Sequence, residues 1–131
     1  MPHVITVVDD LMFHSRIREA ARGAGVDIRS ARTPMDVVEA ARDGGRLVLV
    51  DADSSRLPWV EAVAALRADP SLAAVTVIAF LSHVHVERAE AARAAGASRV
   101  LGRGAFVQEL PRLLAAAAFA VPVTVTEEND R

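Results

Sequence analysis

Short runs of aliphatic and β-branched residues that end at aspartates are the feature that most constrains the fold of this chain. Residues 4–8 read Val-Ile-Thr-Val-Val before Asp9 and Asp10, and residues 47–50 read Leu-Val-Leu-Val before Asp51. Runs this short and this uniformly apolar are typical of strands buried on both faces. Because such strands must be covered by helices on both sides, the two runs favour a parallel sheet inside an α/β domain.

The rest of the chain alternates between strand-like and helix-like segments. Further strands are predicted at 26–30, 75–80 and 98–101, and helices at 11–24, 34–42, 58–68, 86–95 and 106–120. Five βα units in this order predict an α/β fold, a doubly wound parallel five-stranded sheet with strand order 2-1-3-4-5. The spacing of the first helix places Met12 on its apolar stripe. We expect residues 1–120 to form one domain and 121–131 to be a flexible tail.

The composition excludes several classes of protein. The length of 131 residues suits one domain, and a net charge of −2 argues against a general binder of nucleic acid or anionic membranes. Because the chain has no cysteine, it has no disulfide and no thiolate metal site. No apolar run is long enough to span a bilayer, and no signal peptide is visible at the N-terminus. We therefore expect a cytoplasmic protein.

Three aspartates are expected to share one crevice. With strand order 2-1-3-4-5, the first and third strands are neighbours, so Asp9, Asp10 and Asp51 end at the same edge of the sheet. Carboxylates this close repel one another unless one is protonated or a cation binds. Oxygen ligands of this kind suit Mg²⁺. The sequence therefore predicts a magnesium site at this edge.

These segments together resemble the receiver-domain family of response regulators, of which the chemotaxis regulators are an example. The resemblance is carried by residues 7–10 (Val-Val-Asp-Asp), 47–51 (Leu-Val-Leu-Val-Asp) and 95–98 (Ala-Gly-Ala-Ser). It implies the flavodoxin-like receiver fold, with Asp51 as a phosphoacceptor that attacks a phosphoryl group. It also implies that Asp10 binds Mg²⁺ directly, Asp9 helps through water, and the backbone carbonyl of Asp53 completes the metal shell.

Two positions depart from the family pattern. Where receivers carry a lysine and then a proline after the fifth strand, this chain has Arg103 and Gly104, and it contains no lysine at all. A planar guanidinium is not equivalent to a compact ammonium, so Arg103 is expected either to assist at Asp51 or to lock it in an internal ion pair, as in a pseudo-receiver. Either Leu81 or Ser82 fills the position of the family's hydroxyl at the end of the fourth strand.

The resemblance implies a stand-alone signalling module that acts through protein contacts, with no enzymatic activity beyond phosphorylation and dephosphorylation of Asp51. The expected contact face is the fourth helix, fifth strand and fifth helix, about residues 86–118, and the expected partners are a histidine kinase and a second copy of the chain. The alternative is a small Mg²⁺-dependent phosphohydrolase that uses the same aspartates, which requires a second acid–base group near Asp51.

The histidines and Ser82 allow further interpretations. His83 and His85 are spaced as a pair of metal ligands, but no third ligand lies near them in the sequence. Ser82 and His83 resemble part of a hydrolase triad, but the chain lacks the Gly-x-Ser-x-Gly turn that would present the serine. His14 is expected to be a surface residue of the first helix.

Overall fold

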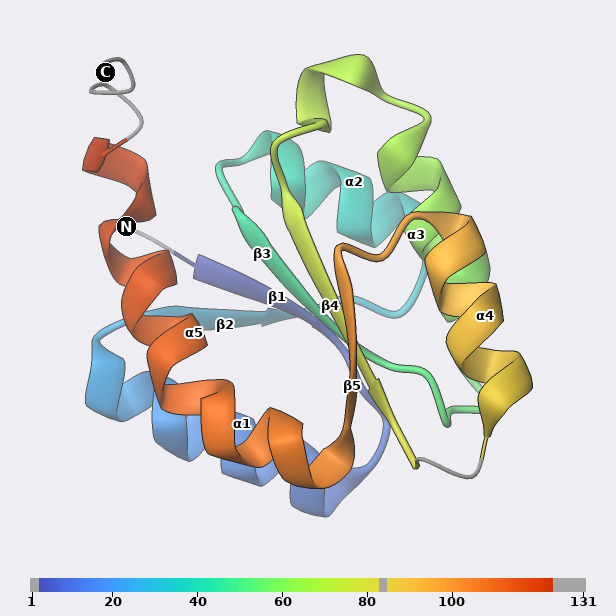
Figure 1. The fold of residues 1–131 in the computed structure, drawn as a ribbon. Coiled ribbons are helices and arrows are strands. Elements are labelled where there is room, and N and C mark those ends of the chain that lie inside the picture. Colours follow the sequence, from blue (N-terminus) through green and yellow to red (C-terminus); the bar gives the residue numbers. More distant parts are fainter. Residues whose placement is uncertain (1–2, 83–84, 124–131) are drawn as a thin grey trace.

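A computed structural model describes residues 3–82 and 85–123 of the chain. Its sheet contains β1 (His3–Val7), β2 (Asp27–Ser30), β3 (Leu47–Asp51), β4 (Thr76–Leu81) and β5 (Arg99–Gly102). All neighbouring strands are parallel and their order is β2-β1-β3-β4-β5, as Figure 1 shows. The predicted doubly wound α/β sheet and its strand order are therefore confirmed.

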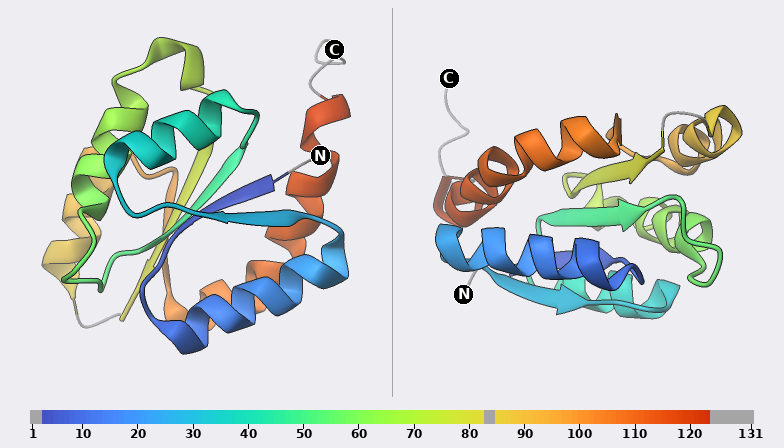
Figure 2. Two further views of the ribbon diagram at one scale, coloured as in Figure 1. Left: turned by 180° about the vertical axis from the view of Figure 1, so that it is seen from behind. Right: turned by 90° about the horizontal axis from the view of Figure 1, so that it is seen from below.

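Helices cover both faces of the sheet. α1 (Leu11–Ala24) and α5 (Arg103–Val123) lie on one face, while α2 (Pro34–Arg42), α3 (Trp59–Arg67) and α4 (Val86–Ala95) lie on the other (Figure 2). A short 3₁₀ turn, η1 (Pro70–Leu72), follows α3. Among the described residues, no helix is both long and apolar enough to cross a membrane.

Local capping explains where two of these helices begin. Asp10 is the N-cap of α1, and its carboxylate accepts a hydrogen bond of 3.1 Å from the backbone N–H of Phe13. Thr33 and Asp36 form a reciprocal capping box at the start of α2, with Pro34 in the first turn. The carboxylate of Asp10 thus caps α1 and, because Asp10 follows β1, also lies at the carboxyl edge of the sheet.

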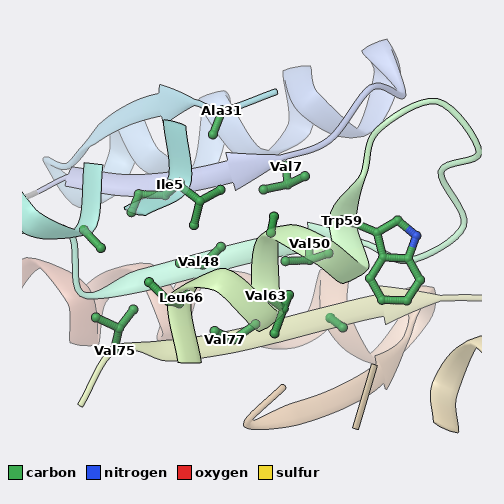
Figure 3. Close-up of a cluster of buried hydrophobic side chains, with 14 of the residues drawn as sticks. Ile5, Val7, Ala31, Val48, Val50, Trp59, Val63, Leu66, Val75 and Val77 are labelled. Carbon is green, nitrogen blue, oxygen red and sulfur yellow. The ribbon is translucent and has the colours of Figure 1, made fainter. Parts of the chain in front are cut away.

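Each face of the sheet has its own apolar core. On the α2–α3–α4 face, Ile5, Val48 and Val77 pack with side chains of the helices, and Trp59 closes the cluster beside Val7 and Val50, near the carboxyl ends of the strands (Figure 3). On the α1–α5 face, three phenylalanines dominate the other core: Phe13, Phe80 and Phe106. β3 is buried along its whole length, because the side chains of its four apolar residues belong to the two cores; its last residue is Asp51.

Three details differ from the sequence predictions. α5 begins at Arg103 rather than 106, because the chain turns from β5 into the helix without a loop, and it continues to Val123. Met12 is 80% exposed rather than buried, since the side chain that α1 turns inward at this level is that of Phe13. Of the predicted tail, residues 124–131 lie outside the described residues.

Candidate functional site

The predicted strand-end aspartates lie at one edge of the sheet. β1 and β3 are paired so that Val7, the last residue of β1, stands opposite Val50, one residue before the end of β3. Asp51 is the last residue of β3, with a side chain only 3% exposed, whereas the side chain of Asp10 is 40% exposed. Asp9 is half-buried and acts on Asp51 through its charge. The topology thus brings Asp51 to one crevice with Asp9 and Asp10, which are more than 40 residues away in the sequence.

Arg103 binds three of the carboxylates in this crevice. Its Nε lies 3.1 Å from Asp53 Oδ2, one terminal nitrogen lies 3.3 Å from Asp51 Oδ1, and the other lies 3.5 Å from Asp10 Oδ2. A planar guanidinium with donors on three nitrogens can span acceptors in this way, whereas an ammonium is a single point charge. These four residues are called the arginine–aspartate cluster below.

An aromatic stack holds the guanidinium of Arg103 from the other side. Its central carbon lies 4.4 Å from the centre of the Phe13 ring and 5.5 Å from that of Phe80, distances at which a cation is attracted to a ring face. Phe80 in turn stacks on Phe106 at 4.2 Å between ring centres. Held between carboxylates and rings, the Arg103 side chain has little freedom to leave the crevice.

Asp53 contributes its carboxylate to the site as well as its carbonyl. Oδ2 accepts hydrogen bonds from Arg103 and from the backbone N–H of Ser82, the latter at 2.9 Å. Arg88, on α4, donates to the Asp53 carbonyl at 3.2 Å and lies 3.5 Å from Oδ1. His85 Nε2 is 3.9 Å from the same Oδ1. Asp53 is therefore surrounded by cationic groups from two helices.

The buried Asp51 and the half-buried Asp53 have pKa values shifted in opposite directions. Burial raises the pKa of Asp51, and this outweighs the opposing effects of the hydrogen bond from the Asp53 amide and of the Arg103 charge. Burial alone also raises the pKa of Asp53, but the hydrogen bonds from Ser82 and Arg103 outweigh it, so that this pKa is lowered. Asp53 is thus the better anion of the two and the stronger partner for Arg103.

The predicted magnesium ligands were Asp9, Asp10, Asp51 and the backbone carbonyl of Asp53. Carboxylate and carbonyl oxygens are chemically suitable ligands. In this arrangement, however, Arg103 binds Asp10 and Asp51, and Arg88 donates to the Asp53 carbonyl. Within the described part of the chain, no group of three or more acidic or histidine side chains is arranged to hold a metal ion. The residues as they stand do not fit Mg²⁺.

The end of β4 shows where Leu81 and Ser82 lie, the two candidates for the position at which receivers carry a hydroxyl. Leu81 is the last residue of the strand, pairs with Gly102 and is buried in the core. Ser82 is the first residue beyond the strand, is half-buried, and donates its backbone N–H to Asp53. The strand therefore ends on an aliphatic side chain, and the hydroxyl-bearing residue comes one position later.

Of the described histidines, His14 differs from expectation, whereas His85 lies at the N-cap of α4, in the segment that enters the fourth helix. The ring of His14 is half-buried rather than on the surface: Nε2 is 2.9 Å from Ser30 Oγ, and Nδ1 accepts a hydrogen bond from Arg18. Burial, followed by the charge of Arg18, lowers its pKa. His85 faces Asp53 across the site, and His83 lies outside the described residues.

Sequence reasoning did not identify Arg88, Phe13 and Phe80 as residues of the site. Arg88 is 35 residues from Asp53, and only the arrangement of α4 against β4 brings the two together. The position of Phe13 could have been predicted from the sequence. It lies three residues after Asp10, which caps α1, and is therefore in the first turn of that helix, beside the crevice. Phe80 is simply the strand residue that pairs with Asp51.

Comparison with known proteins identifies the fold. No family model and no curated protein matches the sequence. Among solved structures, the chemotaxis response regulator CheY4 of Vibrio cholerae superposes with a TM-score of 0.70 at 17% identity, over 89% of this chain and 98% of that one. The phosphorylated cyanobacterial phytochrome response regulator RcpA gives 0.67 at 16% identity, over 95% of this chain and 96% of that one.

A third solved structure was determined with a metal ion. The receiver domain of the sensor histidine kinase PA1611 from Pseudomonas aeruginosa, with magnesium in its active-site cleft, gives a TM-score of 0.68 at 23% identity, over 86% of this chain and 93% of that one. These likenesses and the strand order show that the chain has the flavodoxin-like fold of response-regulator receiver domains. In this chain, the strand ends of that fold carry the arginine–aspartate cluster.

Proposed function

We propose that the chain is a receiver-type signalling module that acts through protein contacts and in which Arg103 serves as the resident cation of the phosphoacceptor crevice. The observation that carries the proposal is the guanidinium of Arg103, which binds Asp10, Asp51 and Asp53 at once. In this proposal Asp51 is a degenerate phosphoacceptor: its carboxylate is paired internally, and the domain keeps one state without a metal ion.

The chemistry of the cluster supports this role. A carboxylate nucleophile needs an exposed lone pair and a cation free to bind the incoming phosphoryl oxygens. Here the Asp51 side chain is 3% exposed, one oxygen accepts from both the Asp53 amide and Arg103, and Arg103 is already committed to three carboxylates. The chain contains no lysine that could take its place. Each of these features disfavours phosphoryl transfer to Asp51.

The proposed contact face is the surface of α4, β5 and α5, about residues 86–118. Among the described helices, α4 has a single buried residue, Ala92, and its first residue, Val86, is 62% exposed. A helix with so little in the core has side chains available for a partner. We propose a protein partner on this face, with a histidine kinase of a phosphorelay and a second copy of the chain as the two candidates to test first.

The proposal is tested by adding Mg²⁺ and beryllofluoride, a mimic of the phosphoryl group, and following Trp59 fluorescence together with the thermal midpoint. Trp59 is buried at the start of α3 and lies near Val50 (Figure 3), the residue before Asp51 in β3. We expect neither signal to change in the wild-type chain. The Arg103→Lys variant, which frees the crevice while keeping the charge, is expected to respond. A saturable response of the wild type that is lost in Asp51→Asn contradicts the proposal.

A further inference from the structure

We infer that the side chain of Asp53 pins the first turn of α4 to the phosphoacceptor crevice, so that the state of the arginine–aspartate cluster sets the position of that helix. This goes beyond the proposed function, which assigns no role to Arg88 and concerns only the cation at Asp51. It makes Asp53 a positioning residue, through a carboxylate for which the sequence suggested only a backbone carbonyl.

The two carboxylate oxygens of Asp53 face different parts of the fold. Oδ2 accepts from the Ser82 amide, at the end of β4, and from Arg103 Nε, at the start of α5. Oδ1 and the backbone carbonyl face α4, where Arg88 Nη1 lies 3.5 and 3.2 Å away, respectively. The side chain of Asp53 is only 15% exposed, whereas that of Arg88 is 41% exposed, so these charge-assisted hydrogen bonds are partly screened by solvent on the α4 side.

His85 brings a second nitrogen-bearing side chain to the α4 side of Asp53. It occupies the N-cap position of α4, yet its side chain makes no capping hydrogen bond, and its Nε2 lies 3.9 Å from Asp53 Oδ1. The groups of α4 that face Asp53 are thus Arg88 and His85, while Arg103 and the Ser82 amide face it from the other side. The first turn of α4 is held by this acid rather than by a cap of its own.

The remainder of α4 explains why these contacts of Asp53 with the first turn, called the pin below, are important for the position of the helix. Only Ala92 is fully buried, and the partly buried residues of α4 that pack on the core are alanines too (Ala89, Ala91 and Ala95), which contribute little apolar contact each. The opposite end of the helix is fixed separately, because Arg67 on α3 donates a hydrogen bond of 2.9 Å to the carbonyl of Gly96. A helix anchored at its C-terminal end and weakly packed along its length opens most readily at its N-terminal end. That end is where Asp53 binds it.

The pin also bounds a groove between α4 and β5. The groove has a volume of about 260 Å³, and its walls include Ser82, His85, Ala89 and Val100. Because Ser82 and His85 both contact Asp53, the width of the groove depends on the same carboxylate that positions Arg103. A partner that moves α4 therefore breaks the contact between Arg88 and Asp53. By reciprocity, a change at Arg103 alters the strength of that same contact.

The test is hydrogen–deuterium exchange of the full chain, in the wild type and in Asp53→Asn, Arg88→Gln and Arg93→Gln. Arg93 is exposed on the same helix, so its variant makes the same charge change away from the pin. We expect amides in the first two turns of α4 to exchange roughly tenfold faster in Asp53→Asn and Arg88→Gln, the factor that corresponds to about 1.4 kcal/mol. Arg93→Gln and the strands are expected to exchange as in the wild type.

A double variant separates the pin from a general loosening of the fold. If Asp53 acts on α4 through Arg88, Asp53→Asn combined with Arg88→Gln opens the helix no more than either change alone. Unchanged α4 exchange in Arg88→Gln, or effects that multiply in the double variant, overturns the inference. Arg88→Gln leaves the three contacts of Arg103 in place, so its result is independent of the Mg²⁺ and beryllofluoride test of the proposed function.

Discussion

Replacing Arg103 with alanine leaves the strand-end carboxylates without their counter-ion, and the cost can be estimated from the structure. Removing one partner of a buried ion pair typically costs about 3–5 kcal/mol. The Asp51 side chain is almost fully buried, but Arg103 is 28% exposed, so solvent screening reduces this figure. The lost contact with the Phe13 ring adds roughly 0.5–1 kcal/mol. We expect Arg103→Ala to lower the free energy of unfolding by about 2–3 kcal/mol.

The pH dependence of that loss gives a second check. The pKa of Asp51 is already raised by burial, and removing Arg103 takes away a charge that opposes this rise. As the pH falls, Asp51 becomes protonated and needs no counter-ion, so the destabilisation of the variant is expected to shrink in acid. Urea unfolding at pH 7 and near pH 4, followed by Trp59 fluorescence, measures both values.

The matched variant Arg103→Lys keeps the positive charge but cannot span three acceptors, so we expect it to lose about 1 kcal/mol. In Arg103→Ala, Mg²⁺ is expected to raise the unfolding midpoint in a saturable way, because the oxygen ligands are released, whereas the wild type is expected to be indifferent to Mg²⁺. A loss below about 0.5 kcal/mol in Arg103→Ala, the same at both pH values, refutes the reasoning, since measured exposed pairs commonly contribute no more than that.

Three further predictions follow from individual residues. Because burial raises the pKa of Asp51, Asp51→Asn is expected to stabilise the fold at pH 7, with the gain fading as the pH falls toward the usual carboxyl range; urea midpoints across pH test this. Gly96 has a φ of +120°, and a Cβ there meets Arg67, so Gly96→Ala is expected to cost about 2 kcal/mol in thermal unfolding. Gly23→Ala, in open space within α1, is the control and is expected to stabilise by up to about 1 kcal/mol. Because burial lowers the pKa of His14, the folded protein disfavours the charged ring; wild-type stability should fall below about pH 6.5, and His14→Gln should remove that part of the slope.

The sheet was predictable because its signals are local. A uniformly apolar strand such as residues 47–50, or a capping pair such as Thr33 and Asp36, determines its element through neighbouring residues alone. The alternation of strands and helices then leaves few topologies, and the observed order is the predicted one. The start of α5 at Arg103 lies earlier than the predicted start at 106, although Gly104, a residue unfavourable in helices, stands in its first turn.

The site was only partly predictable. Aspartates at strand ends are positioned by the topology, so Asp10 and Asp51 could be brought together from the sequence. The contacts of Arg88 and Arg103 with Asp53 depend on side-chain conformations and on how α4 and α5 pack, and the sequence contains no spacing that reports them. Leu81 and Ser82 were indistinguishable because the end of β4 is set by its pairing with β5.

The most direct measurement of the central claim is the NMR signal of the Arg103 Nε–H group during a titration with Mg²⁺. A guanidinium bound to three carboxylates and packed on Phe13 is expected to give a sharp, slowly exchanging signal that Mg²⁺ does not change. A signal broadened by rapid exchange with water, together with saturable Mg²⁺ shifts of the backbone amides of Asp10 and Asp53, contradicts the claim that Arg103 is the resident cation.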